Sequence, residues 1–326
     1  MIDLSTEYMG LKLKNPIIAA SSGLTDTAEK VKKLEDNGVG AVVLKSLFEE
    51  QIRMEVDSMG MNNMFNTYSD NENYIAFYTK QNTVNEYLQL IKDSKAKVDI
   101  PVIASINCYS MGEWVEFTQK IEKAGADGIE LNMFILPGDT DLKGEEIEQK
   151  YFDIIQKVQE HTTLPIAVKL SYYFSGMGEI LKRISQTGIK GMVLFNRFYN
   201  PDVDLDNEKI KPSRIFSVPE ENSTCIRWIG LLSGKIDCDM VASTGINDGF
   251  AALKNILVGA SAVQIASALY QNKLDFIGQM LKQMENWMQK KGYNSVKELI
   301  GKLNYSKHNV ELYERAQFMK YYSSYE

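Results

Sequence analysis

Residues 112–131 read GEWVEFTQKIEKAGADGIEL, and the pattern of this stretch indicates the fold of the whole chain. The amphipathic segment Gly112–Ala124 predicts a helix, and Gly125-Ala126-Asp127 predicts its end. The short apolar run Gly128–Leu131 that follows predicts a strand. The same order of helix, Gly-Ala turn and apolar strand recurs at Asp248–Ile265. The chain therefore repeats a helix–strand unit.

Eight short runs rich in Val, Ile and Ala recur along the chain, and their lack of alternation is typical of parallel strands covered on both faces. They are Pro16–Ala20, Ala41–Leu44, Val102–Ser105, Gly128–Leu131, Ile166–Leu170, Met192–Phe195, Met240–Ser243 and Ala262–Ile265. Expected helices between them include Asp26–Asn37, Gly112–Ala124, Gly144–His161 and Asp248–Leu257. Eight strands alternating with helices predict a (β/α)8 barrel, which needs about 250 residues. A doubly wound open sheet is the alternative.

The 326 residues exceed the length of a minimal barrel, and we expect the surplus in three places. These are an N-terminal lead-in, an insertion after strand 2 at about Gln51–Tyr87, and a C-terminal helical tail from Asp275. Neither a Pro- or Ser-rich linker nor a low-complexity segment divides the chain. We therefore expect residues 1–326 to form a single domain.

The composition argues against several classes of function. With 36 basic and 43 acidic side chains the formal charge is −7, which disfavours nucleic acid or an anionic membrane as a partner. No apolar stretch approaches the ~20 residues of a transmembrane helix, and the N-terminus does not resemble a signal peptide. Three cysteines without a C-x-x-C pair cannot ligate an ordinary iron–sulfur cluster. We expect a cytoplasmic protein.

Polar residues stand where the predicted strands end, which is where a barrel carries its catalytic groups. They are Ser21-Ser22-Gly23, Lys45-Ser46, Asn107, Asn132, Lys169, Asn196-Arg197, Thr244-Gly245 and Ala266-Ser267. The loops after strands 7 and 8 are the usual phosphate site of this fold, so the last two pairs predict phosphate binding. His161 and His308 lie away from the strand ends, which disfavours a histidine triad or a histidine-rich metal site.

On these residues the chain resembles the dihydroorotate dehydrogenase family over nearly its whole length. The resemblance lies in Gly10–Ala20, Lys45-Ser46, Asn132, Ala167–Leu170, Asn196, Ser243–Ile246 and Gln264–Leu269. Leu194–Tyr199 and Trp287–Tyr293 look more like a divergent branch. The resemblance implies an FMN-dependent oxidoreductase that converts dihydroorotate to orotate in pyrimidine biosynthesis. It also implies a soluble class 1 enzyme, compatible with a homodimer, whose electron acceptor is fumarate or an NAD-linked partner subunit.

The resemblance further implies roles for individual residues. The phosphate of FMN would lie on Thr244, Gly245, Ala266 and Ser267, and Ser22 and Gly23 would approach its ring system. Lys169 would lie near the N1/O2 edge of the flavin, with Ser46 also among the cofactor-binding residues. Lys45, Asn132 and Asn196 would hold the substrate and lie close to the flavin.

One loop departs from the family. Its members carry a Cys or Ser base in the loop after strand 4, where this chain reads Asn132-Met-Phe-Ile-Leu-Pro-Gly138. The base position is Ile135, or Leu136 with one residue inserted, and neither side chain accepts a proton. Cys108, Tyr109 and Tyr172 are the alternative candidates for the base. Two other functions stay open: an FMN-binding barrel without dihydroorotate turnover, and a flavin-free lyase with Lys169 as a Schiff base.

Overall fold

Eight parallel strands form a closed barrel in the computed structural model, which describes residues 2–48, 69–107, 111–133, 135–197, 200–307 and 313. Consecutive barrel strands pair with each other, and the pairing of the last with the first closes the circle. In chain order the strands are β3 (Ile17–Ala19), β4 (Ala41–Val43), β6 (Val102–Asn107), β7 (Gly128–Asn132), β8 (Ile166–Leu170), β9 (Gly191–Leu194), β12 (Asp239–Ser243) and β13 (Ala262–Ile265). The predicted barrel is confirmed, with every strand within two residues of its expected bounds, and the open sheet is excluded.

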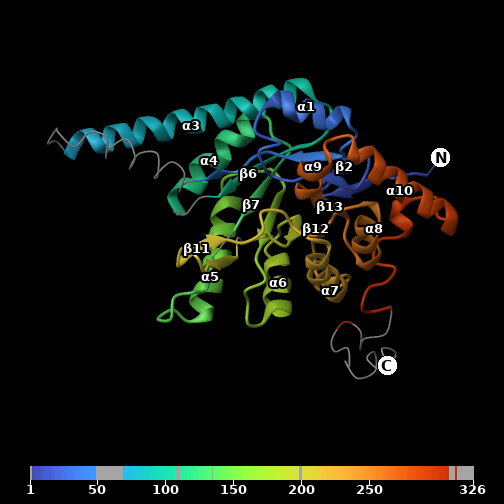
Figure 1. The fold of residues 1–326 in the computed structure, drawn as a ribbon. Helices are drawn as coiled ribbons and strands as arrows, with labels where there is room; N and C mark the ends of the chain where they lie inside the picture. The colour runs from blue at the N-terminus through green and yellow to red at the C-terminus, as the bar shows by residue number, and fades with distance from the viewer. Residues whose placement is uncertain are drawn as a thin grey trace.

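Helices surround the barrel (Figure 1). They are α1 (Ala28–Asp36), α3 (Ser69–Lys97), α4 (Met111–Ala124), α5 (Gly144–Gln159), α6 (Met177–Ser185), α7 (Asn222–Leu232), α8 (Gly249–Val258), α9 (Ser267–Asn272) and α10 (Phe276–Lys291), with short 3-10 turns η1 (Pro219–Glu221) and η2 (Val296–Glu298). Side-chain caps explain two of the starts, because Thr27 and Asp248 accept hydrogen bonds from the first turns of α1 and α8. The expected C-terminal helix from Asp275 is α10, which packs against α8.

The expected insertion after strand 2 is described only in its second part. Residues 51–68 lie outside the described residues, and α3 covers the remainder and continues to Lys97. Tyr87 is buried on α3, and its hydroxyl donates to the carbonyl of Ser105 in β6 at 2.9 Å. The C-terminal part of α3 is therefore a barrel helix, while Figure 1 shows its N-terminal part extending away from the barrel.

A hairpin closes the bottom of the barrel, at the N-terminal ends of the strands. Its strands are β1 (Thr6–Tyr8) and β2 (Leu11–Leu13), and Tyr8, Met9 and Leu13 are buried against inward-facing residues of the strands. Those residues are Ile18, Ala41, Val43, Ile103, Ala167, Val193, Val241 and Ala262. A Cβ on Gly191 would lie 2.7 Å from the Tyr8 ring, so β9 needs glycine at this point. The lead-in is thus a plug at the N-terminal end of the barrel.

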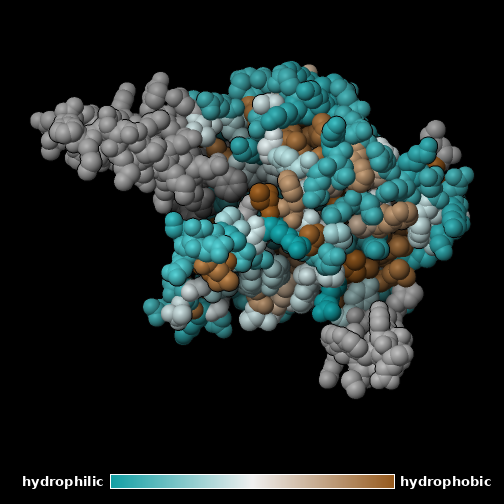
Figure 2. Space-filling view, in the orientation of Figure 1, coloured by the Kyte–Doolittle hydropathy of each residue, from teal (hydrophilic) through white to brown (hydrophobic). Residues whose placement is uncertain are grey.

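A second hairpin, which was not predicted, follows β9. Its strands β10 (Pro201–Asp204) and β11 (Lys209–Pro212) pair in register Val203 with Ile210. Val203, Leu205 and Ile210 are exposed, and Figure 2 shows hydrophobic residues at this hairpin while α1 presents hydrophilic ones. The two-residue strand β5 (Leu47–Phe48) extends the sheet beside β6. None of the described helices has the length and apolar character needed to cross a membrane.

Candidate functional site

A cavity of about 280 Å³ opens at the C-terminal ends of the barrel strands. Residues from β3, β8, β9, β12 and β13 and from the loops after them form its wall. They are Ala20, Ser21, Lys169, Asn196, Arg197, Ile215, Ser217, Ser243, Thr244, Gly245, Ile246, Gln264, Ile265, Ala266 and Ser267. Eight of the predicted strand-end residues therefore meet in one cavity, which we call the mouth: Ser21, Lys169, Asn196, Arg197, Thr244, Gly245, Ala266 and Ser267.

The floor of the mouth carries one buried positive charge. Lys169 points inward from β8 with 8% of its surface exposed, and its Nζ donates to Oε1 of Gln264 in β13 at 2.9 Å. The Nε2 of Gln264 donates in turn to Oε2 of Glu130 in β7, and Glu130 Oε1 lies 3.8 Å from Lys169 Nζ. The ammonium group is thus held in place before any ligand binds.

The two predicted asparagines meet across the barrel. Asn196 donates a hydrogen bond from Nδ2 to Oδ1 of Asn132, and its backbone N–H donates to Leu170 at 2.7 Å. The order β7, β8, β9 in the sheet places Lys169 on the strand between them. The two amides and the ammonium group therefore belong to one polar cluster.

The backbone turns sharply in the loop after β12. Thr244 and Gly245 both have positive φ, 86° and 72°, which is uncommon for a non-glycine residue such as Thr244. A Cβ on Gly245 would lie 2.4 Å from the backbone nitrogen of Asn222, so this position needs glycine. Among the described residues, no hydrogen bond uses the backbone N–H groups of Gly245, Ala266 and Ser267. These donors are available to a ligand.

Arg197 holds a loop that ends beside Ser267 in the mouth. Its guanidinium group donates to the carbonyls of Arg214 and Ile215 at 2.9 Å each, to that of Phe216 at 3.3 Å, and to Glu221 at 3.1 Å. Ser217, which ends this loop, donates its N–H to the hydroxyl of Ser267. Arg197 is therefore a structural anchor of the segment 213–217.

Four of the predicted residues after strands 1 and 2 lie outside the lining of the mouth, namely Ser22, Gly23, Lys45 and Ser46. Lys45 is exposed, and the Ser22 hydroxyl accepts a bond from Leu24 within its own turn. A Cβ on Gly23 would lie 2.8 Å from the Tyr270 hydroxyl. Ser46 is buried, 2.6 Å from the hydroxyl of Ser105 and 3.0 Å from that of Ser21. Ser21 lines the mouth and Ser46 does not, so Ser46 is connected to the cavity by its hydrogen bond with Ser21.

The expected base position is apolar in three dimensions as well. Ile135 packs against the core, and Leu136 is 60% exposed. Cys108 and Tyr109 lie outside the described residues. Tyr172 stands near the mouth with its ring edge-on to Phe195, and burial followed by its contact with Tyr173 raises the pKa of its phenol. A phenol with a raised pKa stays protonated at neutral pH, so Tyr172 is a poor acceptor for a proton.

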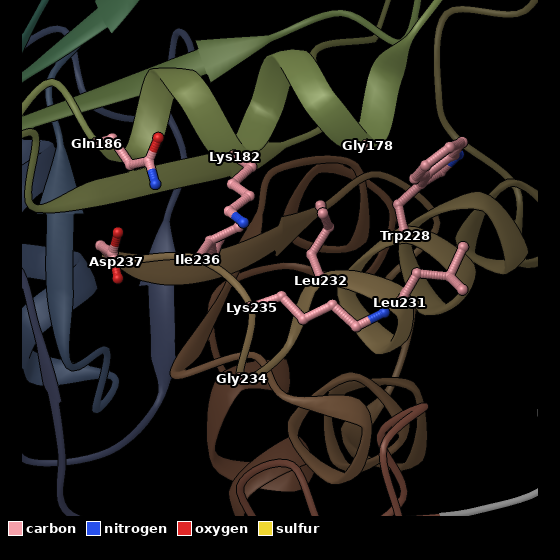
Figure 3. Close-up of a pocket in the computed structure, with 10 residues that line it drawn as sticks. All are labelled: Gly178, Lys182, Gln186, Trp228, Leu231, Leu232, Gly234, Lys235, Ile236 and Asp237. Atoms are coloured by element: carbon pink, nitrogen blue, oxygen red, sulfur yellow. The ribbon is translucent and has the colours of Figure 1, made fainter.

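A larger cavity of about 670 Å³ lies elsewhere, between α6 and α7 (Figure 3). Lys182 from α6, Trp228 from α7 and Lys235 from the turn before β12 line it. It contains none of the predicted residues. Barrel enzymes work at the C-terminal ends of their strands, whereas the segment 234–237 lies before β12. The mouth, although the smaller of these two cavities, is therefore the candidate site.

Two residues of the floor were not singled out from the sequence. Glu130 and Gln264 each interrupt an otherwise apolar strand, Gly-Ile-Glu-Leu and Ala-Val-Gln-Ile. A carboxylate or amide in a strand buried on both faces needs a partner inside the barrel, because burying it unpaired is costly. That interruption was the available signal.

The fold and the mouth together define a (β/α)8 barrel with a charged floor at the C-terminal ends of its strands. The family model for dihydroorotate dehydrogenase matches residues 3–288. Similar proteins are the catalytic subunits of dihydroorotate dehydrogenase B (NAD(+)) of Thermoplasma volcanium and Pyrococcus abyssi. The first is 26% identical over 92% of this chain and 98% of its own, and the second 27% over 91% and 98%. The chain belongs to the dihydroorotate dehydrogenase family, which is a family of oxidoreductases.

Proposed function

We propose that this chain is a single-domain FMN-dependent oxidoreductase that acts on dihydroorotate or a closely related planar, carboxylated heterocycle. The observation that carries the proposal is the fixed ammonium group of Lys169 on the floor of the same cavity whose rim carries the backbone N–H groups of Gly245, Ala266 and Ser267. These N–H groups bond to no other described residue. Bound FMN would supply the acceptor for the hydride that leaves the substrate. The name of the relatives favours an NAD-linked partner subunit as electron acceptor over fumarate.

The residues of the mouth suit the two ends of such a cofactor. Gly245, Ala266 and Ser267 would donate backbone hydrogen bonds to the phosphate, together with Thr244. Lys169 would face the N1/O2 edge of the flavin, where a fixed positive charge stabilises the negative charge that reduction brings. The hydrogen bond from Lys169 to Gln264 favours this role over a Schiff-base lysine, since it holds the ammonium group as a donor.

Substrate binding would fall to the asparagine pair and to Lys45. Asn132 and Asn196 each have further amide donors or acceptors beyond their mutual bond, and they flank the strand of Lys169. Exposed Lys45 would meet a carboxylate at the opposite rim, with Ser22, Gly23 and Ser46 nearby on the cofactor side. The amides would then orient the ring, and the lysine would neutralise the carboxylate.

The apolar loop limits what the site does with dihydroorotate. A general base contributes typically ~10²–10⁴-fold to a reaction that removes a proton, and Ile135 and Leu136 supply none. We therefore expect slow turnover of dihydroorotate. A barrel that keeps FMN but has a different substrate, or none, is the second candidate, and the same two residues favour it.

Anaerobic reduction of the bound flavin tests both candidates. Purified protein should carry about one FMN per chain, released by heat and identified by chromatography. Wild type, Ile135→Cys and Leu136→Cys are mixed with dihydroorotate without oxygen, and bleaching of the flavin is followed over time. Leu205→Cys, which adds a thiol to the exposed hairpin, is the control.

The expected result is slow bleaching in the wild type and in Leu205→Cys, and faster bleaching in one of the loop variants. Rapid, saturable bleaching of the wild type would show that another residue acts as base. Equal, negligible rates in all four proteins would favour the second candidate. Colourless protein that takes up no added FMN would overturn the proposal as a whole.

A further inference from the structure

Glu130 is a buried carboxylate to which the proposed function gives no task. It points into the barrel from the middle of β7 and is only 1% exposed. A charged group in such an interior needs a counter-charge and hydrogen bonds, because losing water costs several kcal/mol. Its surroundings therefore indicate why it is there.

The Glu130 carboxylate and two side chains from other strands, Gln264 and Lys169, contact one another. Gln264 connects the other two: its Oε1 accepts from Lys169 and its Nε2 donates to Glu130 Oε2. Glu130 Oε1 lies 3.8 Å from Lys169 Nζ and has no hydrogen-bond partner among the described residues. One oxygen thus fixes the orientation of Gln264, and the other directs its charge at the ammonium group.

The negative charge of the same carboxylate also acts on Tyr8, in the plug at the bottom of the barrel. Tyr8 is fully buried, and its hydroxyl makes no hydrogen bond within the part of the chain that the structure describes. Burial, and after it the negative charge of Glu130, raises the pKa of Tyr8 well above its usual range. The floor therefore holds a positive charge toward the mouth and a negative charge whose influence reaches the plug.

We propose that Glu130 is a positioning residue for Lys169: acting through Gln264, it fixes the ammonium group at the floor and partly cancels its charge there. The inference rests on the proposed function in one respect, namely that a flavin edge lies above Lys169. The pairing of Glu130 with Lys169 is independent of it. Glu130 then sets how strongly the floor favours the reduced, negatively charged cofactor.

The midpoint potential of bound FMN tests the cancellation of charge. Glu130→Gln keeps an acceptor for Gln264 and removes the negative charge, so the potential should rise. A tenfold gain in the preference for reduced flavin corresponds to about 30 mV for a two-electron couple. Glu130→Asp keeps the charge and should stay near the wild-type value.

Asp239→Asn is the matched control. Asp239 is a partly buried carboxylate at the first residue of β12, where it accepts from the Met9 N–H at the bottom of the barrel. Its removal should leave the potential unchanged. A wild-type potential in FMN-bound Glu130→Gln, or an equal rise in Asp239→Asn, would overturn the proposal.

Thermal unfolding without cofactor tests the pairing itself. Lys169→Met leaves a buried carboxylate without its counter-charge and should lower the melting temperature strongly. The double variant Lys169→Met/Glu130→Gln should recover much of that loss, even where Glu130→Gln alone folds poorly. A double variant that melts below both single variants, or fails to fold while Lys169→Met folds, would overturn the pairing. A protein that takes up no FMN would overturn the proposed function and leave this comparison intact.

Discussion

Asn196 at the end of β9 donates a side-chain hydrogen bond to Asn132 at the end of β7, although 64 residues separate them in the chain. The bond passes over the end of β8, the strand that carries Lys169. Each amide keeps a donor or an acceptor for a ligand, and each orients the other. The two residues should therefore act on substrate as a unit.

Replacing either asparagine should weaken the binding of orotate, the expected product. Asn132→Ala and Asn196→Ala should each lower its affinity about tenfold, or ~1.4 kcal/mol. The double variant should lose less than the sum, because each single change already breaks the shared bond. Titration of the FMN-loaded protein, followed by the flavin absorbance, measures this. Asn207→Ala, in the turn of the hairpin, should bind normally, and full affinity in Asn196→Ala would remove that residue from the site.

Adding one methyl group at Gly245 should damage the phosphate end of the mouth. Gly245→Ala combines a positive φ with a Cβ that would collide with the backbone of Asn222. Gly125→Ala is the control, because its φ is also positive, 93°, but its Cβ meets nothing within 4 Å. The free energy of unfolding of the control should fall by about 1–2 kcal/mol from backbone strain alone. Gly245→Ala should lose more and retain less FMN, as measured by denaturant unfolding and flavin content. Equal losses in the two variants would contradict the prediction.

Loss of Arg197 should free the segment 213–217. Its guanidinium group bonds three backbone carbonyls and Glu221, and hydrogen bonds to charged groups are worth about 1.5–3 kcal/mol. Arg197→Ala should cost roughly 2–3 kcal/mol of stability and speed tryptic cleavage after exposed Arg214. Arg183→Ala is the control. Arg183 in α6 lies over the Phe152 ring and beside exposed Glu179, so its loss should cost less than about 1 kcal/mol of stability and leave the cleavage unchanged. Unchanged cleavage in Arg197→Ala would show that other contacts hold the segment.

Two of the three cysteines should be inert at neutral pH. Burial raises the pKa of Cys225 to about 12, and burial together with Asp239 and Asp237 raises that of Cys238 to about 12. Because the thiolate is the reactive form, only about one such thiol in 10⁴ is reactive at pH 8, and reactivity should increase as the pH rises. In Cys108→Ser, Ellman's reagent at pH 8 should therefore react slowly with the native protein and promptly once it is unfolded. Fast reaction of both thiols in the native variant would contradict the burial of Cys225 and the raised pKa of half-buried Cys238.

The sequence determined the barrel and the direction in which its polar residues lie. Strands such as Ile166–Leu170 are buried on both faces, so each appears in the sequence as a continuous apolar run without polar alternation. Eight such runs alternating with helices are typical of one closed barrel. Parallel strands also bring their C-terminal ends to one side. Lys169, Asn196 and Thr244 could therefore be expected at a common mouth before any contact was known.

Only the tertiary structure decided which of these side chains meet and what holds them. Lys169 and Gln264 are 95 residues apart in the chain. They bond because closure of the barrel brings both side chains into its interior at the same level. The three-residue strands of the plug are too short for a periodic pattern, and Tyr8 fits only because Gly191 lacks a Cβ. Arg197 could be assigned to the strand end from the sequence, but its loop carbonyls lie beyond an unpredicted hairpin. The periodicity of apolar residues shows which residues of a single helix or strand are buried. These contacts instead depend on how segments that are distant in the chain pack against one another.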